Sequence, residues 1–369
     1  MKIDANSVTF EPQDMAFVKK FGILEATEMA LDYHAEHPNL PFLYDAEQLA
    51  GFLGISRGEL NDIVNHIQKE YKEAHLPKKD GTYRSLCVPS IRLRFCQDPI
   101  KEKILPQLPV SKFATAYQKG STTRGNAEPH IGKKFLLKLD ITDFFGSITF
   151  EQVQCTAFNT RYVSRQVGYL LTSLCCKDDS LPQGAATSPA LSNIVMYRFD
   201  DYIGRWCSQR QIAYTRYCDD MTFSANRPLY GVYQKVKTML REMGFELNES
   251  KTHFIGNDNR QSVTGLVVNE KLSIPSGYKR DLRQEVYYAL KFGVEDSVLH
   301  GHRSDFVEDG RPICCPTYML HLMGKVQYVL QIEPENLWFK DAQKKLLAYI
   351  YEHYSESLSY YLHFNKNGK

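Results

Sequence analysis

The sequence predicts a mixed α+β fold with a β-α-β-β-α-β unit at its centre. Strand-forming residues occupy four segments, namely 135–141, 214–225, 245–247 and 252–255. Apolar residues recur at helical spacing in the intervals between them, over 150–174, 188–209 and 232–243. The resulting order of strand, helix, strand hairpin, helix and strand is that of a ferredoxin-like unit. Gly244 is expected to end the last of these helices, because glycine accepts the left-handed conformation that follows many helix ends.

The residues before this unit are expected to be mainly helical. Residues 1–77 show helical spacing of apolar residues, including a segment from 45 to 53. Ser56 is a suitable N-cap for a further helix that runs to about Tyr71, because Glu59 follows it at capping-box spacing.

A hairpin and three further helices complete the predicted elements. The hairpin is expected over 77–84, with Asp80-Gly81 as its turn. Apolar and aromatic residues predict helices over 91–105, around 280–292 and over 337–362.

Composition indicates a globular chain with several subdomains. The chain has 369 residues, of which 43% are hydrophobic, which is enough for two or three packed subdomains. It contains no run of about 18 apolar residues, and its first residues lack the apolar core of a signal peptide. We therefore expect a soluble, cytoplasmic protein with no membrane partner.

The nine cysteines are expected to be reduced thiols. Their number is odd, and no two of them have Cys-x-x-Cys spacing. A zinc site can be imagined from His300, His302, Cys314 and Cys315. Adjacent cysteines are poorly spaced for tetrahedral ligation, so this site is disfavoured.

The small net charge of +2 hides a strong asymmetry along the chain. Residues 1–77 carry 6 Lys and Arg against 13 Asp and Glu, whereas residues 78–138 carry 13 against 4. Aromatic residues are interleaved with the cations of this basic block (78–138), at Tyr83, Phe95, Phe113 and Tyr117. Such a surface suits a phosphate-rich partner such as a nucleic acid. On charge alone, a solvated surface of mixed helices is an equally good explanation.

Two adjacent aspartates, Asp219 and Asp220, interrupt the strand-forming run 214–225. Aspartate is depleted from strands, and two neighbouring carboxylates repel each other. A cation is therefore expected beside them, and a divalent metal is the natural candidate. The alternative is a plain hairpin turn over Cys218–Met221, which would lack the Gly or Asn that tight hairpins favour.

Asp140 is expected to join this pair. It ends the predicted strand 135–141, which lies beside the central hairpin in a ferredoxin-like unit. Three carboxylates brought together in this way suit two Mg²⁺ ions about 3.5–4 Å apart, an arrangement that promotes phosphoryl and nucleotidyl transfer.

Three more residues gain significance from this cluster. If Asp140 binds metal, the ring of Phe145 could press against the sugar of an incoming nucleotide and exclude a 2′-hydroxyl; at least one of Phe144 and Phe145 should belong to the core. Gln183 and Gly184 lie in a loop before a helix, where glycine would let the backbone approach a nucleotide and glutamine would donate hydrogen bonds.

These segments, taken in order, resemble the reverse transcriptases. The runs 140–145, 182–189, 217–220 and 244–251 are similar to four successive palm motifs of that family. The resemblance implies that Asp140, Asp219 and Asp220 are catalytic and hold the metals, and that Phe145 is the sugar gate. It also places Gln183 against the nascent base pair and assigns contacts with the dNTP triphosphate to Lys79 (or Lys78), Arg84 and Lys251.

The same resemblance implies a right-hand polymerase fold with a helical N-terminal extension. Its parts would be the extension (1–44), fingers with the basic block (45–135), a ferredoxin-like palm (136–270) and a helical thumb that recognises RNA (271–369).

Two short signatures narrow the resemblance to the bacterial retron reverse transcriptases. Asn126-Ala-Glu-Pro-His130 is similar to their Asn-Ala-x-x-His signature, and Val263-Thr264-Gly265 matches their Val-Thr-Gly signature. Cys218 departs from the family, which usually has Ala there. The resemblance implies an enzyme that binds its cognate structured non-coding RNA and copies part of it into branched RNA-linked DNA (msDNA). An accessory effector protein and a role in anti-phage defence are expected on the same ground.

Other functions are less consistent with these residues. Another bacterial reverse transcriptase, similar to those of group II introns, would share the palm motifs. A metal-dependent nuclease would explain the carboxylates but neither Phe145 nor the loop with Gln183. A non-catalytic RNA-binding scaffold would not need all three carboxylates. A P-loop is excluded by the spacing of Gly125 and Gly132 and by Lys134, which stands where Ser or Thr is needed.

Overall fold

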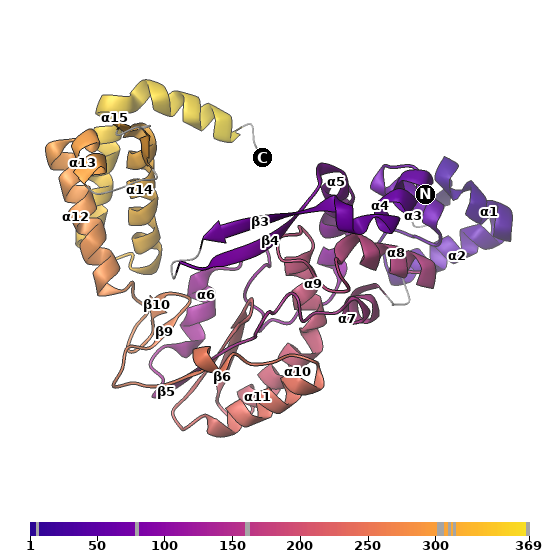
Figure 1. Cartoon of the computed structure of the whole chain (residues 1–369), viewed down its shortest axis with the longest axis horizontal. Helices are drawn as coiled ribbons and strands as arrows, with labels where there is room; N and C mark the ends of the chain where they lie inside the picture. Colours follow the sequence, from indigo (N-terminus) through magenta and orange to yellow (C-terminus); the bar gives the residue numbers. More distant parts are fainter. Residues whose placement is uncertain are drawn as a thin grey trace. The chain divides into compact units, whose positions relative to one another are not determined.

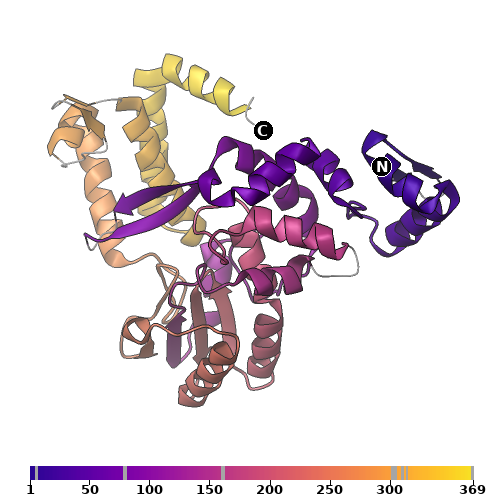
Figure 2. The ribbon, with the colours of Figure 1, turned by 45° about the vertical axis from the view of Figure 1, so that its right-hand side comes forward.

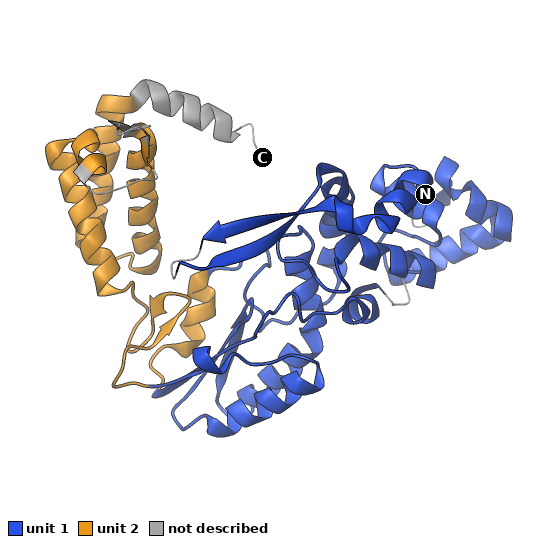
Figure 3. Ribbon diagram, viewed as in Figure 1, with its two compact units in different colours: residues 1–122, 134–255 blue, residues 123–133, 256–369 orange. Residues whose placement is uncertain are grey.

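The computed structural model describes residues 1–4, 7–77, 81–158, 163–300, 306–308, 311–312 and 315–366. They form two compact units (Figure 3). Unit 1 comprises residues 1–122 and 134–255, and unit 2 comprises residues 123–133 and 256–369. Both units contain helices and strands, and the strands β6 (Ala213–Tyr217), β7 (Asp220–Ala225) and β5 (Phe135–Asp140) of the central sheet are antiparallel, which confirms the mixed α+β class.

The centre of unit 1 is a four-stranded sheet. Its strands are β5 (Phe135–Asp140), β6 (Ala213–Tyr217), β7 (Asp220–Ala225) and β8 (His253–Gly256). Their spatial order is β6-β7-β5-β8, so the first and third strands of the unit pair at its centre, as in a ferredoxin-like unit. The helices α10 (Tyr197–Ser208) and α11 (Tyr230–Glu242) pack against this sheet (Figures 1 and 2).

Apolar side chains fix the register of the central strands. Residues 221–225 of β7 are all buried, and Phe223 stacks on Tyr214 of β6 with ring centroids 4.6 Å apart. β5 runs antiparallel to β7 and pairs Phe135 with Ala225 at one end and Asp140 with Asp220 at the other. A slip of one residue would turn the buried set toward solvent, so the register is strongly determined.

The connection from β5 to β6 is helical, as the apolar spacing predicts. It contains α7 (Phe150–Val153), the π-helical segment η6 (Gln154–Phe158), α8 (Arg165–Cys175) and α9 (Ser188–Val195), followed by α10. Thr149 and Gln152 form a capping box at the start of α7. Pro189 in the first turn of α9 suits a helix start, because proline has no N–H to leave unpaired there.

The first 77 residues are less helical than predicted. The helices are α1 (Met15–Phe21), α2 (Ile23–Glu36), α3 (Ala46–Leu53) and α4 (Arg57–Asn65), with short 3-10 turns η1 (Pro12–Asp14) and η2 (Ile67–Glu70). The Ser56 side chain caps α4 by accepting a hydrogen bond from the Glu59 amide at 3.2 Å, as expected. The all-helical prediction was wrong for a small hairpin of β1 (Lys2–Asp4) with β2 (Ser7–Thr9), and for residues 71–77.

Residues 71–77 form a strand because they pair with the strand that follows them in a hairpin. This strand, β3 (Tyr71–Pro77), pairs with β4 (Tyr83–Pro89) along its whole length. Cross-strand pairing overrides the weak local preference for helix. The hairpin is thus confirmed and is longer than predicted; Lys78–Asp80, which include part of its expected turn, lie outside the described residues. It leads to α5 (Ile91–Pro99), η3 (Ile100–Ile104) and η4 (Leu105–Gln107), near the predicted helix over 91–105.

Unit 2 joins a short inserted segment to helices at the end of the chain. The insertion contains α6 (Thr123–Ala127) and η5 (Glu128–His130). The rest contains β9 (Ser262–Val263), β10 (Leu266–Val267), α12 (Ser276–Phe292), α13 (Val294–His300), β11 (Val307–Glu308), β12 (Arg311–Pro312), α14 (Cys315–Ile332) and α15 (Leu337–Lys366). The predicted helices around 280–292 and over 337–362 are confirmed by α12 and α15.

Two expectations concern features of the chain as a whole. Among the described residues, no helix is both long and apolar enough to span a bilayer. The cysteines whose side chains the structure describes are free thiols. The disfavoured zinc set includes His302 and Cys314, which lie outside the described residues.

Candidate active site

The aspartate pair lies at a two-residue hairpin turn between β6 and β7. Tyr217 pairs with Asp220 across the hairpin, so Cys218 and Asp219 form the turn. The turn therefore lies one residue earlier than the sequence alternative of Cys218–Met221. Cys218 takes the left-handed conformation (φ 60°) that Gly or Asn usually supplies. A non-glycine residue held in this region stores strain of about 1–3 kcal/mol, which the surrounding structure must support.

The strand register brings Asp140 to the same corner of the sheet. Asp140 is the last residue of β5 and stands directly opposite Asp220, and the Ile141 amide donates to the Asp219 carbonyl at 3.3 Å. Side chains directly opposite each other in an antiparallel pair lie on the same face, where like charges destabilise the sheet. Loss of hydration raises the pKa of Asp219, and the nearby Asp140 raises it further. The pKa of Asp220 is likewise raised by loss of hydration and then by Asp219.

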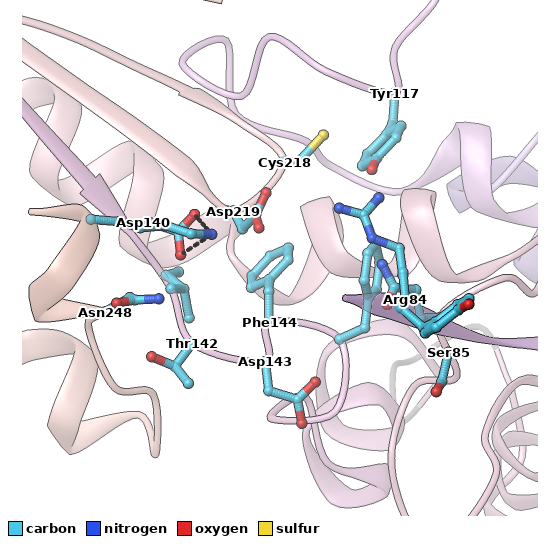
Figure 4. A pocket seen from close by; sticks show the side chains of 15 residues that line it. Arg84, Ser85, Tyr117, Asp140, Thr142, Asp143, Phe144, Cys218, Asp219 and Asn248 are labelled. Atoms are coloured by element: carbon cyan, nitrogen blue, oxygen red, sulfur yellow. Dashed lines mark hydrogen bonds and ion pairs between the residues drawn. The ribbon is translucent and has the colours of Figure 1, made fainter. Parts of the chain in front are cut away.

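A polar cavity of about 500 Å³ opens beside these carboxylates. Figure 4 shows Asp140 and Asp219 together on one side of it, and Arg84 and Tyr117 on the other. The remaining lining residues come from the segments 83–85, 141–145, 183, 218, 248 and 251. Asp220 is reachable by solvent, although protein atoms around its carboxylate displace part of its hydration, and it does not line the cavity. Asp140 and Asp220 are thus paired in the sheet, Asp219 lies in the adjoining turn, and Asp140 and Asp219 line the cavity.

A lysine neutralises Asp140 in this arrangement. The Lys251 ammonium lies 3.1 Å from Oδ1 and 3.0 Å from Oδ2 of Asp140, and this bond raises the pKa of Lys251. Lys251 ends η7 (Glu249–Lys251), which is held next to β5 by a hydrogen bond from the Asn248 amide to the Asp140 carbonyl at 2.8 Å. Glu249 also accepts hydrogen bonds from Tyr233 and Lys237 of α11. These contacts hold the backbone around Lys251 in place, and the Lys251 side chain reaches the cavity from there.

The donor set fits a magnesium site completed by substrate. Within the described ranges, no group of three His, Cys, Asp or Glu side chains could hold a metal ion by itself. Mg²⁺ commonly uses only one or two carboxylates and takes its other ligands from water and substrate phosphates. Asp140 and Asp219 on a cavity wall, with raised pKa at Asp219, are consistent with that chemistry.

The two phenylalanines after Asp140 have different environments. Both rings line the cavity, but Phe144 is almost fully buried in the core of unit 1, whereas Phe145 is only partly buried. At least one of them was expected in the core, and the structure shows that it is Phe144. Phe145 is therefore the more accessible of the two rings to a bound nucleotide.

The loop before α9 contacts the β3–β4 hairpin. Gln183 lines the cavity, and its backbone carbonyl accepts a hydrogen bond from the Cys87 amide at 2.7 Å. Gly184 has φ 121°, and a Cβ atom there would lie 2.8 Å from the Cys87 carbonyl oxygen. In this structure, glycine is needed because strand β4 passes so close. Gly184 is not among the residues that line the cavity.

Arg84 belongs to β4, and Lys79 falls in the sequence between β3 and β4. Arg84 is an exposed residue of β4 that lines the cavity, and its charge acts on Asp219 to oppose the rise in that residue's pKa. Lys79 and its alternative, Lys78, lie outside the described residues.

The two short signatures meet in unit 2. The Asn126 amide donates to the Thr264 hydroxyl at 3.4 Å, and that hydroxyl donates to the Thr123 carbonyl at 3.2 Å. Asn126, His130 and Val263 are buried, and Gly265 has a left-handed backbone (φ 83°). Burial lowers the pKa of His130 to about 3, with a contribution from Lys133. The signatures thus join the inserted segment to the β9–β10 hairpin.

Sequence reasoning missed several residues of the site. Tyr117, Thr142, Asp143 and Asn248 line the cavity, although none was assigned a role. Arg216, which precedes Tyr217, is fully buried. An arginine inside an apolar strand is a signal for a buried acidic partner, because an unpaired buried charge is very costly.

A comparison with protein families defines the class. Residues 76–268 match the family model described as reverse transcriptase (RNA-dependent DNA polymerase). The match includes the sheet, the β4 arginine and every residue that lines the cavity. The chain is therefore an RNA-directed DNA polymerase.

Curated relatives identify the branch of that class. The chain is 28% identical over 270 residues to the retron Ec86 reverse transcriptase of Escherichia coli, covering 72% of this chain and 84% of the relative. It is 31% identical over 320 residues to the retron Mx65 reverse transcriptase of Myxococcus xanthus, covering 80% and 70%. It is 34% identical over 233 residues to the retron Ec83 reverse transcriptase of E. coli, covering 59% and 75%. The chain belongs to the retron reverse transcriptase family.

Solved structures add little to this assignment. Telomerase from Candida albicans, in complex with a fragment of telomeric RNA, aligns with a TM-score of 0.43 and 12% identity, covering 84% of this chain and 68% of that one. Apo telomerase from Candida tropicalis aligns with a TM-score of 0.43 and 12% identity, covering 76% and 58%.

Proposed function

We propose that this reverse transcriptase binds its own structured non-coding RNA and copies part of it into single-stranded DNA that stays joined to the RNA, as msDNA. The observation that carries the proposal is the cavity lined by Asp140, Asp219 and Phe145, within a chain of the retron family. The family implies RNA template binding and divalent metal ions; the branched product, the accessory effector protein and a role in anti-phage defence extend that analogy.

The carboxylates have the first role in this proposal. Asp140, Asp219 and Asp220 would hold two Mg²⁺ ions, which when bound promote deprotonation of the attacking hydroxyl and neutralise charge on the leaving phosphates. The raised pKa values of Asp219 and Asp220 mean that a cation would stabilise their ionised forms. Asp220 does not line the cavity, so in this proposal it would contribute to metal binding less directly than Asp140 and Asp219.

The cations around the cavity would bind the dNTP triphosphate. Lys251 contacts Asp140 in the structure, and it would transfer its ammonium to phosphate oxygens when a metal neutralises that carboxylate. Arg84 lies across the cavity on β4, where its planar guanidinium can bind two phosphate oxygens at once. Lys79, which lies between β3 and β4 in the sequence, would be a further contact to the triphosphate.

Phe145 and Gln183 would select the nucleotide. The Phe145 ring lines the cavity next to the Asp140 segment, where it can exclude a ribose 2′-hydroxyl by its size. Gln183 enters from the loop that β4 fixes in place, and its side chain would lie against the new base pair. Gly184 would support this loop by allowing its close approach to Cys87.

The nucleic acid that co-purifies with the protein tests the proposal. We expect sequencing to find one abundant RNA joined covalently to a short DNA copied from it, and we expect that DNA to be absent from the Asp219→Asn/Asp220→Asn variant. Recovery of unlinked cellular RNA alone, from active protein, would reject the msDNA product while leaving RNA-directed synthesis intact.

A further inference from the structure

A buried arginine lies directly behind the turn that carries the aspartate pair. Arg216 of β6 is fully buried, and it forms a 2.6 Å salt bridge with Asp200 of α10, which is also fully buried. Its Nε donates to Oδ1 and Oδ2 of Asp200 at 3.0 and 3.1 Å, and the Tyr214 hydroxyl donates to Oδ1 at 2.7 Å. Burial of such a pair is tolerated only when its hydrogen bonds are satisfied, as they are here.

One donor of this guanidinium reaches beyond the ion pair to the turn. Nη1 of Arg216 donates to the backbone carbonyl of Cys218 at 2.8 Å. That carbonyl belongs to the planar peptide group between Cys218 and Asp219. The bond therefore fixes the orientation of the peptide group that leads into Asp219. Cys218, whose carbonyl accepts this bond, is the residue with the left-handed backbone (φ 60°).

The same side chain is tied to two other walls of the cavity. Nη2 of Arg216 donates to Asn193 Oδ1 at 3.1 Å, and Nδ2 of Asn193 donates to the Ala116 carbonyl at 2.8 Å, just before Tyr117. The guanidinium also lies 5.8 Å from the ring centroid of Phe144, in the segment that follows Asp140.

We propose that Arg216 is a positioning residue that fixes Asp219 relative to Asp140 through the Cys218 carbonyl, with Asp200 as its buried counter-ion. The inference rests on the proposed role of these aspartates as metal ligands. A planar guanidinium suits this task because it can bind Asp200 and the turn at the same time, in a fixed geometry.

Two variants at this position separate positioning from folding. Arg216→Lys keeps the charge but loses the forked geometry. Arg216→Met combined with Asp200→Leu replaces the buried pair by apolar side chains, a change that often preserves stability. In both we expect the Mg²⁺ concentration for half-maximal DNA synthesis to rise about tenfold, as is typical when a residue that orients metal ligands is lost. The KM for dNTP at saturating Mg²⁺ should change little. The kcat should fall, and Mn²⁺ should restore part of that loss.

Tyr214→Phe is the matched control. It removes one hydrogen bond to the same Asp200 carboxylate and leaves the bond from Arg216 to the Cys218 carbonyl intact. We expect a lower melting temperature with an unchanged Mg²⁺ requirement. A purely structural role for Arg216 predicts instead that the Mg²⁺ requirement follows melting temperature across all three variants.

The results distinguish this inference from the function on which it rests. A folded Arg216 variant with the wild-type Mg²⁺ requirement would overturn the positioning role, as would failure of both Arg216 variants to fold while Tyr214→Phe folds. Synthesis by Asp219→Asn/Asp220→Asn at the wild-type rate would instead reject the metal-ligand assignment. An inactive aspartate variant beside unaffected Arg216 variants would reject only the role of Arg216.

Discussion

Single residues around the turn are held in positions that are unfavourable on their own. Asp140 faces Asp220 across a strand pair, and Cys218 has a left-handed backbone without being glycine. Both features cost stability, and both place a carboxylate at the edge of the cavity. Sites that bind cations often retain such strain, because removing it would also remove the binding groups.

Neutralising the aspartate pair is expected to abolish activity and to increase stability. Asp219→Asn with Asp220→Asn is expected to abolish DNA synthesis and to leave RNA binding nearly intact. It should also raise the melting temperature near neutral pH when divalent ions are chelated, because two repelling carboxylates become neutral. Primer extension and thermal denaturation with EDTA check both expectations.

The pH dependence of stability follows from the same shifts. The pKa values of Asp219 and Asp220 are raised above the ordinary 3.8 in the folded protein. The folded state therefore binds more protons between the ordinary and raised values, so these groups lower stability as pH rises through that window. The double variant should lose this decrease. An unchanged pH profile of the melting temperature would contradict the assigned shifts.

Phe145 provides a separate test at the residue scale. Phe145→Ala should allow ribonucleotides to be incorporated, because a smaller side chain no longer excludes the 2′-hydroxyl. Relative kcat/KM for a dNTP and its matching rNTP measures the effect. The control is Phe199→Leu, a core substitution at a residue that does not line the cavity, and it should alter stability without relaxing sugar selection. Equal discrimination in Phe145→Ala and wild type would remove the gate assignment.

At the scale of elements, the inserted segment 123–133 is tied to the β9–β10 hairpin by buried polar residues. Asn126 and Thr264 are hydrogen-bonded across 138 positions of sequence, and His130 is buried nearby in unit 2. Asn126 and His130 are buried. Substituting either residue should therefore disturb the packing of this junction before anything else.

His130 should make unit 2 sensitive to acid. Its pKa is lowered to about 3 by burial, from an ordinary value of 6.5. The unfolded chain therefore binds the additional proton as pH falls below about 6.5, and stability should fall by up to about 1.4 kcal/mol per pH unit toward the folded pKa. His130→Gln should show a shallower decline. Hydrogen exchange of α6 amides between pH 6.5 and 4.5 provides the measurement, and equal slopes in both proteins would rule out this origin.

At the scale of the whole molecule, charge is segregated along the chain. Residues 78–138 carry 13 Lys and Arg against 4 Asp and Glu, while residues 1–77 carry 6 against 13. Because the family implies RNA template binding, RNA is the expected partner of this basic block. Neutralising phosphates releases counterions, and this term dominates the affinity for nucleic acid.

Salt dependence of RNA binding tests the basic block. Replacing Arg94 and Lys101, which are exposed, by Ala should weaken binding of the cognate RNA and reduce the slope of log K against log salt by about 0.7 to 1 for each lost phosphate contact. The matched control is Lys19→Ala with Lys20→Ala, an exposed pair in the acidic region. Equal changes of slope in both double variants would show that the block has no special role.

Much of the architecture was predictable because it depends on local patterns. The apolar spacing predicted α10, α11, α12 and α15, and the Ser56 cap and the central hairpin were also correct. The strand β3 was missed because its partner is a separate strand, whose pairing outweighs local helix preference. The turn was displaced by one residue because Cys218 accepts a conformation that its side chain does not favour.

The sequence by itself determined the chemistry of the site: the aspartates, the aromatic residue after Asp140, the basic hairpin and the family to which they belong. Only the tertiary structure decided how each member of the two adjacent pairs is exposed at the cavity. Asp219 lines it and Asp220 does not, and Phe145 is partly exposed there while Phe144 is buried in the core. Only folding could join Arg216 to Asp200, because this choice depends on register and on helices packed from elsewhere in the chain. Residue types record the available chemistry, whereas distances between remote segments decide which groups can act together.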